Sequence, residues 1–510
     1  MNKYIIAYDL GTGGIKASLY NDLGKSLASS FVPYDTYYPF TGWHEQRPMD
    51  WWNAVVESTQ NLLMKVNIDK NDIEGIGISG HSLGVVPIDQ DGNLLRDTTP
   101  IWSDGRAVVQ AQKFFQKVDE EKWYMTTGNG FPAPLYSIFK IMWYKDNEPE
   151  MFKKVDKFIG TKDYINFMLT GIACTDYSYA SGSGVYNLEK WKYEGAFIEA
   201  SGICESVLPK IVPSTKILGN LTKEAAKILG LPNSIKVVCG GVDNACMALG
   251  ARGINEGRVY TSLGSSAWIA VTSTKPIVNA QKRPYVFTHC IPGMFTSATC
   301  IFAAGSSLKW VRDNICKDMI REGEEKGIDP YIFVNKAAED SPIGAKKLLF
   351  NPSLAGGSGL DKSPRVRGGF IGLDLGHTQG DMIRATMEGI AMNLRIALDV
   401  LGEYTQISKQ MLIVGGGGKS KLWRQIFADT YNKEIIKTNV GQDAGSLGAA
   451  ACAAVGIGLW KDFSIIDEIH KIKEVVMPNQ NHNEIYEKYL EVFRNVSDMQ
   501  SDIGDMLHEL

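Results

Sequence analysis

The sequence has no large excess of positive or negative charge, and it contains no long hydrophobic run. Its 53 Lys and Arg residues nearly balance 57 Asp and Glu residues. The net charge of −4 is unlike the strongly basic charge of nucleic-acid-binding domains. The longest stretch of mainly apolar and small residues, 447–460, is shorter than the roughly 20 residues that a membrane span needs. We therefore expect small-molecule partners, no nucleic acid and no membrane.

Paired cysteine motifs are also missing. The eight cysteines are scattered, with no CxxC pair and no nearby histidine at metal-ligand spacing, so we expect most of them to be buried, reduced thiols. The N-terminal apolar run ends at Asp9, which makes it shorter than the core of a signal peptide, about 7 to 15 residues. Both features favour a cytoplasmic location.

The length predicts two domains. A chain of 510 residues exceeds the roughly 250 to 300 residues at which a single hydrophobic core stops growing. Apolar residues (44%) and charged residues (22%) are typical of a soluble globular protein. No Pro- or Ser-rich linker is present, so the cluster Gly250, Gly253 and Gly257 is our guide to domains at 1–252 and 253–510.

Strand patterns occur in a similar order in both halves. Residues 5–9 and 15–19 read as strands joined by the turn Gly11–Gly14, and 26–32 and 73–79 read as further strands. In the second half, 258–261 and 268–272 read as strands around the turn 262–266. The repeat predicts an internal duplication whose turns serve a common site.

Three helices are expected later in the chain. Apolar residues at alternating steps of four and three predict an amphipathic helix over 383–401, ended by Gly402. A strand over 411–414 leads into Gly415–Gly418, after which Ser420 is placed to cap a helix. A helix over 485–496 is expected to serve packing.

The segment from Asp9 to Lys16 combines an acid at a strand end with a glycine-rich turn. Glycines let backbone amides approach a phosphate closely, and a carboxylate suits the water shell of Mg²⁺. It is not the dinucleotide fingerprint, because Lys16 holds the third glycine position and a strand follows. A plain glycine hairpin with a solvated acid is the alternative.

The segment from Gly415 to Ser420 ends in Gly-Lys-Ser but is not a P-loop. The first glycine of that motif would fall at residue 413, which is isoleucine. A glycine run at a strand end can instead accept a flat ring or a ribose. An ordinary strand-to-helix loop is the competing interpretation.

Asp243 stands between a short apolar run with two glycines and a stretch of small residues. Phosphoryl transfer needs a carboxylate that orients the attacking hydroxyl and accepts its proton late. Such a base contributes typically 10²- to 10⁴-fold to the rate. A helix N-cap explains the same pattern equally well.

Other polar and aromatic residues allow two interpretations each. His81 and Ser82 stand at a strand tip, where ligands tend to bind, although a lone histidine there is usually satisfied structurally. Trp102 precedes Asp104 and Arg106, which we expect to form a structural ion pair. The His-Glu pair at residues 44–45 has no second histidine at the zinc-protease spacing.

Together these segments resemble the FGGY carbohydrate kinases from residue 4 to about 455. The most specific match is the C-terminal signature, residues 368–388; the N-terminal signature around Ser137, Lys140 and Trp143 is matched except at Tyr144. The resemblance implies an α/β, two-domain, actin-like (ribonuclease H-like) ATPase fold with duplicated domains around a central cleft. It is the fold of the superfamily of sugar kinases, heat-shock chaperones and actin.

The resemblance also implies a role for each matched residue. Asp243 corresponds to the catalytic base, and Asp9 is expected to hold Mg²⁺. The residues expected at the sugar are His81, Ser82, Trp102, Asp243 and Asn244. Those expected to bind ATP are Thr12, Gly13, Lys16, Thr261, Gly264, Ser265, Gly415, Gly416, Gly417 and Lys419.

The implied activity is transfer of the ATP γ-phosphate to a ketose, and the implied assembly is a homodimer. Residues 42–52 and 160–164 are similar to pentulose kinases and favour a pentulose such as xylulose. However, xylulokinases usually continue Ile-Ser-Gly with Gln-Met-His-Gly, and here Leu83 replaces that histidine. Another ketose, a deoxy sugar, a polyol or a sugar acid stays open. The rivals are an actin-like or chaperone-like ATP-driven binding module and a dehydrogenase.

Overall fold

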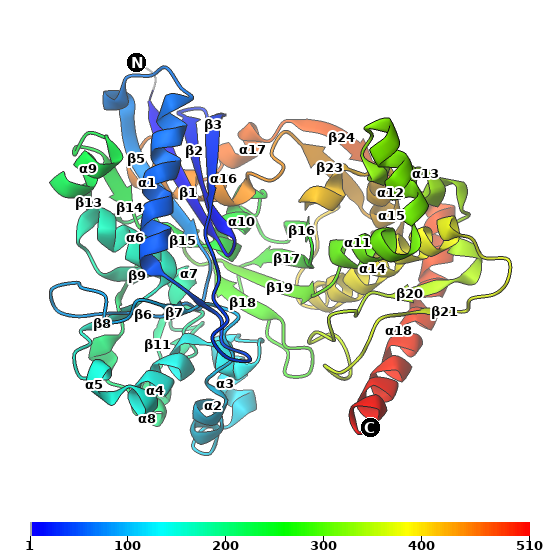
Figure 1. Ribbon diagram of the computed structural model, residues 1–510, viewed down its shortest axis with the longest axis horizontal. Coiled ribbons are helices and arrows are strands. Elements are labelled where there is room, and N and C mark those ends of the chain that lie inside the picture. The colour runs from blue at the N-terminus through cyan, green and yellow to red at the C-terminus, as the bar shows by residue number, and fades with distance from the viewer. Residues whose placement is uncertain (1–2) are drawn as a thin grey trace. The chain divides into compact units, whose positions relative to one another are not determined.

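The computed structural model describes residues 3–510 as two compact α/β units (Figure 1). The first unit comprises the chain up to Asn255 together with Thr272–Ser297 and Asp443–His470. The second comprises Glu256–Val271, Ala298–Gln442 and Lys471–Leu510. A division into 1–252 and 253–510 therefore omits two later segments that pack with the first unit. The second of these segments, Asp443–His470, begins with a run of small residues that packs closely in the first unit through tertiary contacts, which local sequence patterns do not reveal.

The first sheet has the order β13-β14-β5-β1-β2-β3, with β15 also paired to β5. Strands β1 and β2 are antiparallel, whereas β5 runs parallel to β1, β14 and β15. The strands are β1 (Tyr4–Gly11), β2 (Gly14–Asn21), β3 (Ser26–Pro33), β5 (Ile73–Gly80), β13 (Ile217–Asn220), β14 (Lys236–Val238) and β15 (Gly241–Val242). The strands predicted over 5–9, 15–19, 26–32 and 73–79 are confirmed.

The second sheet repeats this pattern. Its order includes β19-β17-β16-β22-β23-β24, in which β16 is antiparallel to β17 and parallel to β22. Strand β22 is parallel to β23, which is antiparallel to β24. The strands are β16 (Val259–Leu263), β17 (Ala267–Ser273), β19 (Phe295–Ile301), β22 (Gln410–Val414), β23 (Glu434–Thr438) and β24 (Ile472–Val476). The matching directions confirm the predicted duplication.

Helices cover both faces of the first sheet. Alternate residues of a strand point to opposite faces. Tyr8 bonds Thr59 of α1 (Pro48–Met64) through its hydroxyl, while the neighbouring Asp9 lies against Gly445 of α16 (Ala444–Gly456). Helix α16 also packs closely on α10 (Asp243–Gly250). The end of β1 is therefore enclosed by a helix contributed from late in the chain.

The predicted helices are present, with different bounds. Helix α14 (Gln379–Gly402) begins earlier than expected, because Thr378 and Asp381 form a capping box. Ser420 caps α15 (Lys421–Tyr431) by accepting from the Trp423 amide, as predicted. Helix α18 (Gln480–His508) is much longer than the predicted 485–496. Across residues 3–510, no helix combines the length and the apolar character needed to cross a bilayer.

Candidate active site

The carboxylate of Asp9 lies at the end of β1, beside the first turn of α16. A Cβ atom at Gly445 would stand 2.7 Å from Asp9 Oδ2, so only glycine leaves room for this carboxylate. Burial raises the pKa of Asp9, and the nearby Ser79 hydroxyl and the charge of Lys16 oppose this rise. Lys16 also forms an ion pair with Asp443, which immediately precedes α16. The site thus concentrates charged oxygen atoms suited to a hard cation.

The turn after Asp9 exposes bare backbone. Thr12 and Gly13 are exposed, and a Cβ atom at Gly13 would meet nothing within 4 Å. The Trp102 indole donates to Thr12 Oγ1 at 2.9 Å, and the Gln46 amide donates to Thr12 O at 2.7 Å. The structure therefore brings a predicted sugar residue and a predicted phosphate residue together.

Asp243 lies at the same edge of the first sheet as Asp9. In the parallel register, Ser79 of β5 is opposite both Asp9 of β1 and Gly241 of β15, so these three strands end together. Carboxyl ends of parallel strands are where ligands bind in α/β proteins. Asp243 follows β15 directly as the first residue of α10, within electrostatic reach of Asp9.

The environment of Asp243 perturbs its ionisation. Its carboxylate accepts one hydrogen bond, from the Asn244 amide at 2.8 Å. Burial, with a smaller contribution from the Asp9 charge, raises the pKa of Asp243 to about 7. Val242, not Asp243, occupies the N-cap position of α10. Asp243 is therefore not the helix cap, and a pKa near the working pH is what a catalytic base requires.

His81 and Ser82 follow β5 at this edge and are both buried. Both ring nitrogens of His81 lack a hydrogen-bond partner among the described residues. Burial lowers the pKa of His81 to about 3, so the ring is neutral. Because an unpaired buried polar atom is costly, these nitrogens are available to a bound hydroxyl or to water.

Asp104 and Arg106 form the structural ion pair that the sequence predicts. The Arg106 guanidinium donates to Asp104 Oδ2 at 2.8 Å and to Glu45 Oε1 at 2.6 Å, and it stacks over the Trp43 ring. The side chain of Arg106 is fully buried. Trp43 therefore packs against this ion cluster.

The second unit contains a cavity of about 560 Å³, within the range of small-molecule sites. The predicted ATP residues that line it are Gly264, Ser265, Gly416, Gly417 and Lys419. Thr261 and Gly415 are not among its lining residues; Thr261 is buried within β16. The sequence did not reveal the contributions of α11 (Gly305–Ile315) and α13 (Pro330–Asp340), because their lining residues carry no local motif.

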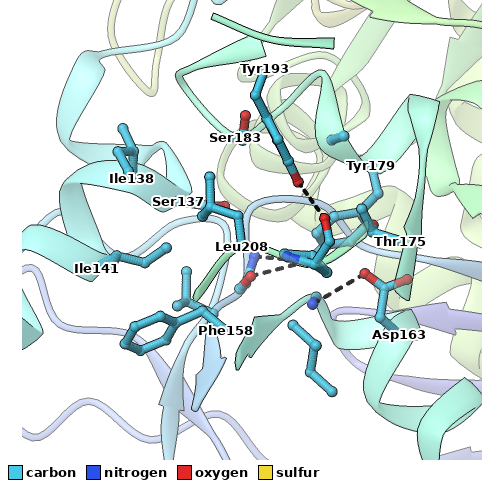
Figure 2. A pocket seen from close by; sticks show the side chains of 16 residues that line it. Ser137, Ile138, Ile141, Phe158, Asp163, Thr175, Tyr179, Ser183, Tyr193 and Leu208 are labelled. Carbon is cyan, nitrogen blue, oxygen red and sulfur yellow. Dashed lines mark hydrogen bonds between the residues drawn. The ribbon is translucent and has the colours of Figure 1, made fainter. Parts of the chain in front are cut away.

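A much smaller cavity, of about 30 Å³, lies in the first unit beside Gly160 and Asp163 (Figure 2). The Asp163 side chain points toward it and accepts from the Gly160 amide at 3.2 Å. None of the predicted site residues lines it. This volume matches about one water molecule, so the cavity does not accommodate a sugar.

Three scattered cysteines meet in the core of the first unit. The sulfur atoms of Cys246, Cys290 and Cys452 lie within 4.8 Å of one another, a spacing that a soft metal ion could bridge. Hydrogen bonding to Cys290 and burial raise the pKa of Cys246 well above its ordinary value, so the thiol is protonated. The close packing of α10 on α16 brings Cys246 and Cys452 together, and Cys290 joins them from the loop after the strand Tyr285–Thr288. Cysteine behaves here as a small apolar residue.

Comparisons with known proteins agree with this architecture. The model for the N-terminal domain of the FGGY family of carbohydrate kinases matches residues 4–250, and the model for its C-terminal domain matches residues 259–457. Xylulose kinase from Bacillus subtilis is 30% identical and 99% of each chain is covered. Gluconokinase from Bacillus licheniformis is 28% identical, covering 98% of this chain and 96% of its own.

Solved structures give the same result. Ligand-bound xylulose kinase from Lactobacillus acidophilus has a TM-score of 0.88 and 28% identity, with 97% of each chain covered. Gluconate kinase from the same species has a TM-score of 0.88 and 27% identity, covering 97% of this chain and 98% of its own. The predicted fold class is confirmed, and the chain belongs to the FGGY family of carbohydrate kinases.

Proposed function

We propose that this carbohydrate kinase transfers the ATP γ-phosphate to a hydroxyl of a ketose, and that the ketose is a pentulose such as xylulose. The observation that carries the proposal is the Asp243 carboxylate, which lies at the same strand edge as Asp9 and whose pKa burial raises to about 7. The xylulose kinases among its relatives support the pentulose. Family membership makes the chain an enzyme, so the binding-module and dehydrogenase interpretations are wrong.

Asp243 acts as the base in this proposal. Its carboxylate orients the sugar hydroxyl, and as the hydroxyl oxygen bonds to phosphorus, the bond to the ADP oxygen breaks and the hydroxyl proton passes to Asp243. A pKa near 7 makes this carboxylate a stronger base than an ordinary aspartate, whose pKa is about 3.9. His81, Ser82, Trp102 and Asn244 position the sugar.

The first unit also supplies the phosphate turn and the metal site. The exposed turn at Thr12 and Gly13 accepts phosphate oxygens on its amides, and Lys16 adds positive charge. Asp9 fits Mg²⁺ because a carboxylate held in this buried position favours a neighbouring cation. A Mg²⁺ ion held there would neutralise phosphate charge.

The nucleotide is held by the second unit in this proposal. Its cavity of about 560 Å³ has bare glycine backbone at Gly416 and the indole of Trp423 among its lining, which suits a ribose and a flat base. Lys419 and Ser265 contribute polar groups, with Thr261, Gly264 and Gly415 shaping the surrounding turns.

A sugar acid such as gluconate is the second candidate. Gluconokinases are nearly as similar to this chain as xylulose kinases are. In addition, Leu83, which stands where xylulokinases carry a histidine, is 1% exposed and packs in an apolar cluster. That position offers a sugar hydroxyl no hydrogen bond, which weakens the case for xylulose itself.

An ADP-release assay tests both candidates, with ATP, Mg²⁺ and one acceptor at a time from D-xylulose, other ketoses, deoxy sugars, polyols and D-gluconate. We expect one acceptor class to stimulate release and Asp243→Asn to lower kcat by about 10²- to 10⁴-fold. Release that no acceptor stimulates would refute the kinase proposal. Strong stimulation by gluconate alone would replace the pentulose with the sugar acid.

We also propose a cytoplasmic homodimer that binds neither nucleic acid nor membranes. The near-neutral charge balance supports the absence of nucleic-acid binding. All eight cysteines are free thiols, as is typical of proteins in a reducing compartment. Light scattering during gel filtration tests the dimer, and a single monomer mass across concentrations would contradict it.

A further inference from the structure

Buried polar groups form hydrogen bonds with the backbone of the turn that precedes Asp243. Gly240 has φ 71°, and a Cβ atom there would stand 1.8 Å from Ile78 O, so the turn is pressed against β5. The Gly240 amide donates to Ser214 O at 2.9 Å. The Val242 amide, directly before Asp243, donates to Ser178 Oγ at 2.9 Å.

The Ser178 hydroxyl acts both as a hydrogen-bond donor and as an acceptor. It accepts from Val242 N and donates its single proton to Asp176 Oδ2, which fixes its orientation. The same carboxylate oxygen accepts from the Ser178 amide at 2.9 Å. Ser178 and Asp176 are both fully buried, so water cannot replace these bonds.

The Asp176 carboxylate forms an ion pair with a buried lysine. Lys162 Nζ lies 3.0 Å from Asp176 Oδ1 and 2.6 Å from Asp163 Oδ1, and all three side chains are fully buried. Buried ion pairs of this kind are weak evidence for stability, because desolvation offsets the attraction. These buried ion pairs lie next to the residues that hydrogen-bond the Asp243 turn, which points to a role other than stability.

We propose that Asp176 and Ser178 are positioning residues for Asp243. They fix the Val242 amide, and Val242 is the N-cap of α10, whose first residue is Asp243. The Val242 side chain makes no capping hydrogen bond, so the Ser178 hydroxyl orients the peptide bond between Gly241 and Val242, which lies one residue before the catalytic carboxylate. This inference rests on the proposed role of Asp243 as the base.

Ser214 provides a matched control. Its hydroxyl donates to the same Asp176 Oδ2 at 2.8 Å, and its side chain is also buried. Its bond to the turn uses the backbone carbonyl, which alanine retains. Ser214→Ala therefore removes an equivalent buried hydrogen bond to Asp176 but leaves the Val242 amide paired.

Hydrogen exchange of the Val242 amide in the full chain tests the structural half of the inference without any sugar. We expect exchange at least about 10-fold faster in Ser178→Ala than in wild type, and unchanged exchange in Ser214→Ala, because only the first loses the acceptor. Equal exchange in both variants would overturn the inference.

Steady-state kinetics test the functional half with ATP and the acceptor that the ADP-release assay selects. We expect Ser178→Ala to lower kcat by about 10- to 100-fold, the cost of a displaced catalytic group, with KM for ATP within about twofold. Ser214→Ala should keep kcat within about threefold at an equal Tm. In an Asp243→Asn background, Ser178→Ala should lower kcat little further.

Two failures are distinguishable. If Asp243→Asn lowers kcat strongly but Ser178→Ala behaves like Ser214→Ala, the positioning role is refuted and the base is retained. If Asp243→Asn keeps full activity, the base assignment itself fails. If Ser178→Ala does not fold, Ser178→Cys replaces it in the same measurements, because a thiol is only a weak donor and acceptor.

Discussion

At the scale of single residues, the ionisation of Asp243 links structure to activity. The base is active when ionised, and burial and Asp9 raise its pKa to about 7. We therefore expect kcat to fall as the pH drops below about 7. Asp9 is also the proposed metal ligand, so the cleanest direct measurement is carbon-detected titration of the Asp243 carboxyl group. A midpoint near pH 4 would contradict this environment.

The same raised pKa predicts an effect on stability. An acid whose folded pKa is raised loses folded-state stability as the pH rises from its unfolded pKa, about 3.9, toward about 7. Asp243→Asn removes this penalty and should be more stable than wild type at pH 8, by up to about 4 kcal/mol. The difference should shrink toward pH 4. Denaturant unfolding at both pH values measures it, and a pH-independent difference would contradict the prediction.

Gly445 is a second residue with a specific expected effect. A methyl group there would stand 2.7 Å from Asp9 Oδ2 and 3.1 Å from its Cγ, so Gly445→Ala must displace the carboxylate. We expect at least about a 10-fold loss of kcat/KM, because displacing a group at the reacting centre is costly. Gly441→Ala, where the methyl would meet nothing within 4 Å, is the control. Equal activity of the two variants would argue against a role for Asp9.

At the scale of elements, α16 depends on small residues where it meets α10. A Cβ atom at Gly448 would stand 2.0 Å from Cys246 O, a backbone atom that cannot rotate away. Gly448→Ala should therefore separate the helices and destabilise the first unit by about 1 to 3 kcal/mol or more. Thermal unfolding beside Gly441→Ala measures this, and an unchanged Tm would contradict the close crossing.

At the scale of the whole molecule, the interleaved units predict how the chain tolerates truncation. Helix α16 covers the face of β1 and β5 that carries Gly77, where a Cβ atom would meet Ala449 O at 2.2 Å. A fragment ending at residue 252 leaves that face uncovered. We expect the fragment to aggregate or to bind a hydrophobic dye. Cooperative unfolding of a soluble 1–252 fragment would contradict the expectation.

Local signals in the sequence determined the opening strands of both halves, the glycine turn after Asp9 and the cap at Ser420, because alternation, glycine and capping residues act within a few positions. They also singled out Asp243. Only the tertiary structure decided that Val242 takes the cap position, that Asp9 lies close enough to raise the pKa of Asp243, and that Ser178 supports its turn. Such properties depend on burial and on contacts between distant segments, which no local pattern encodes.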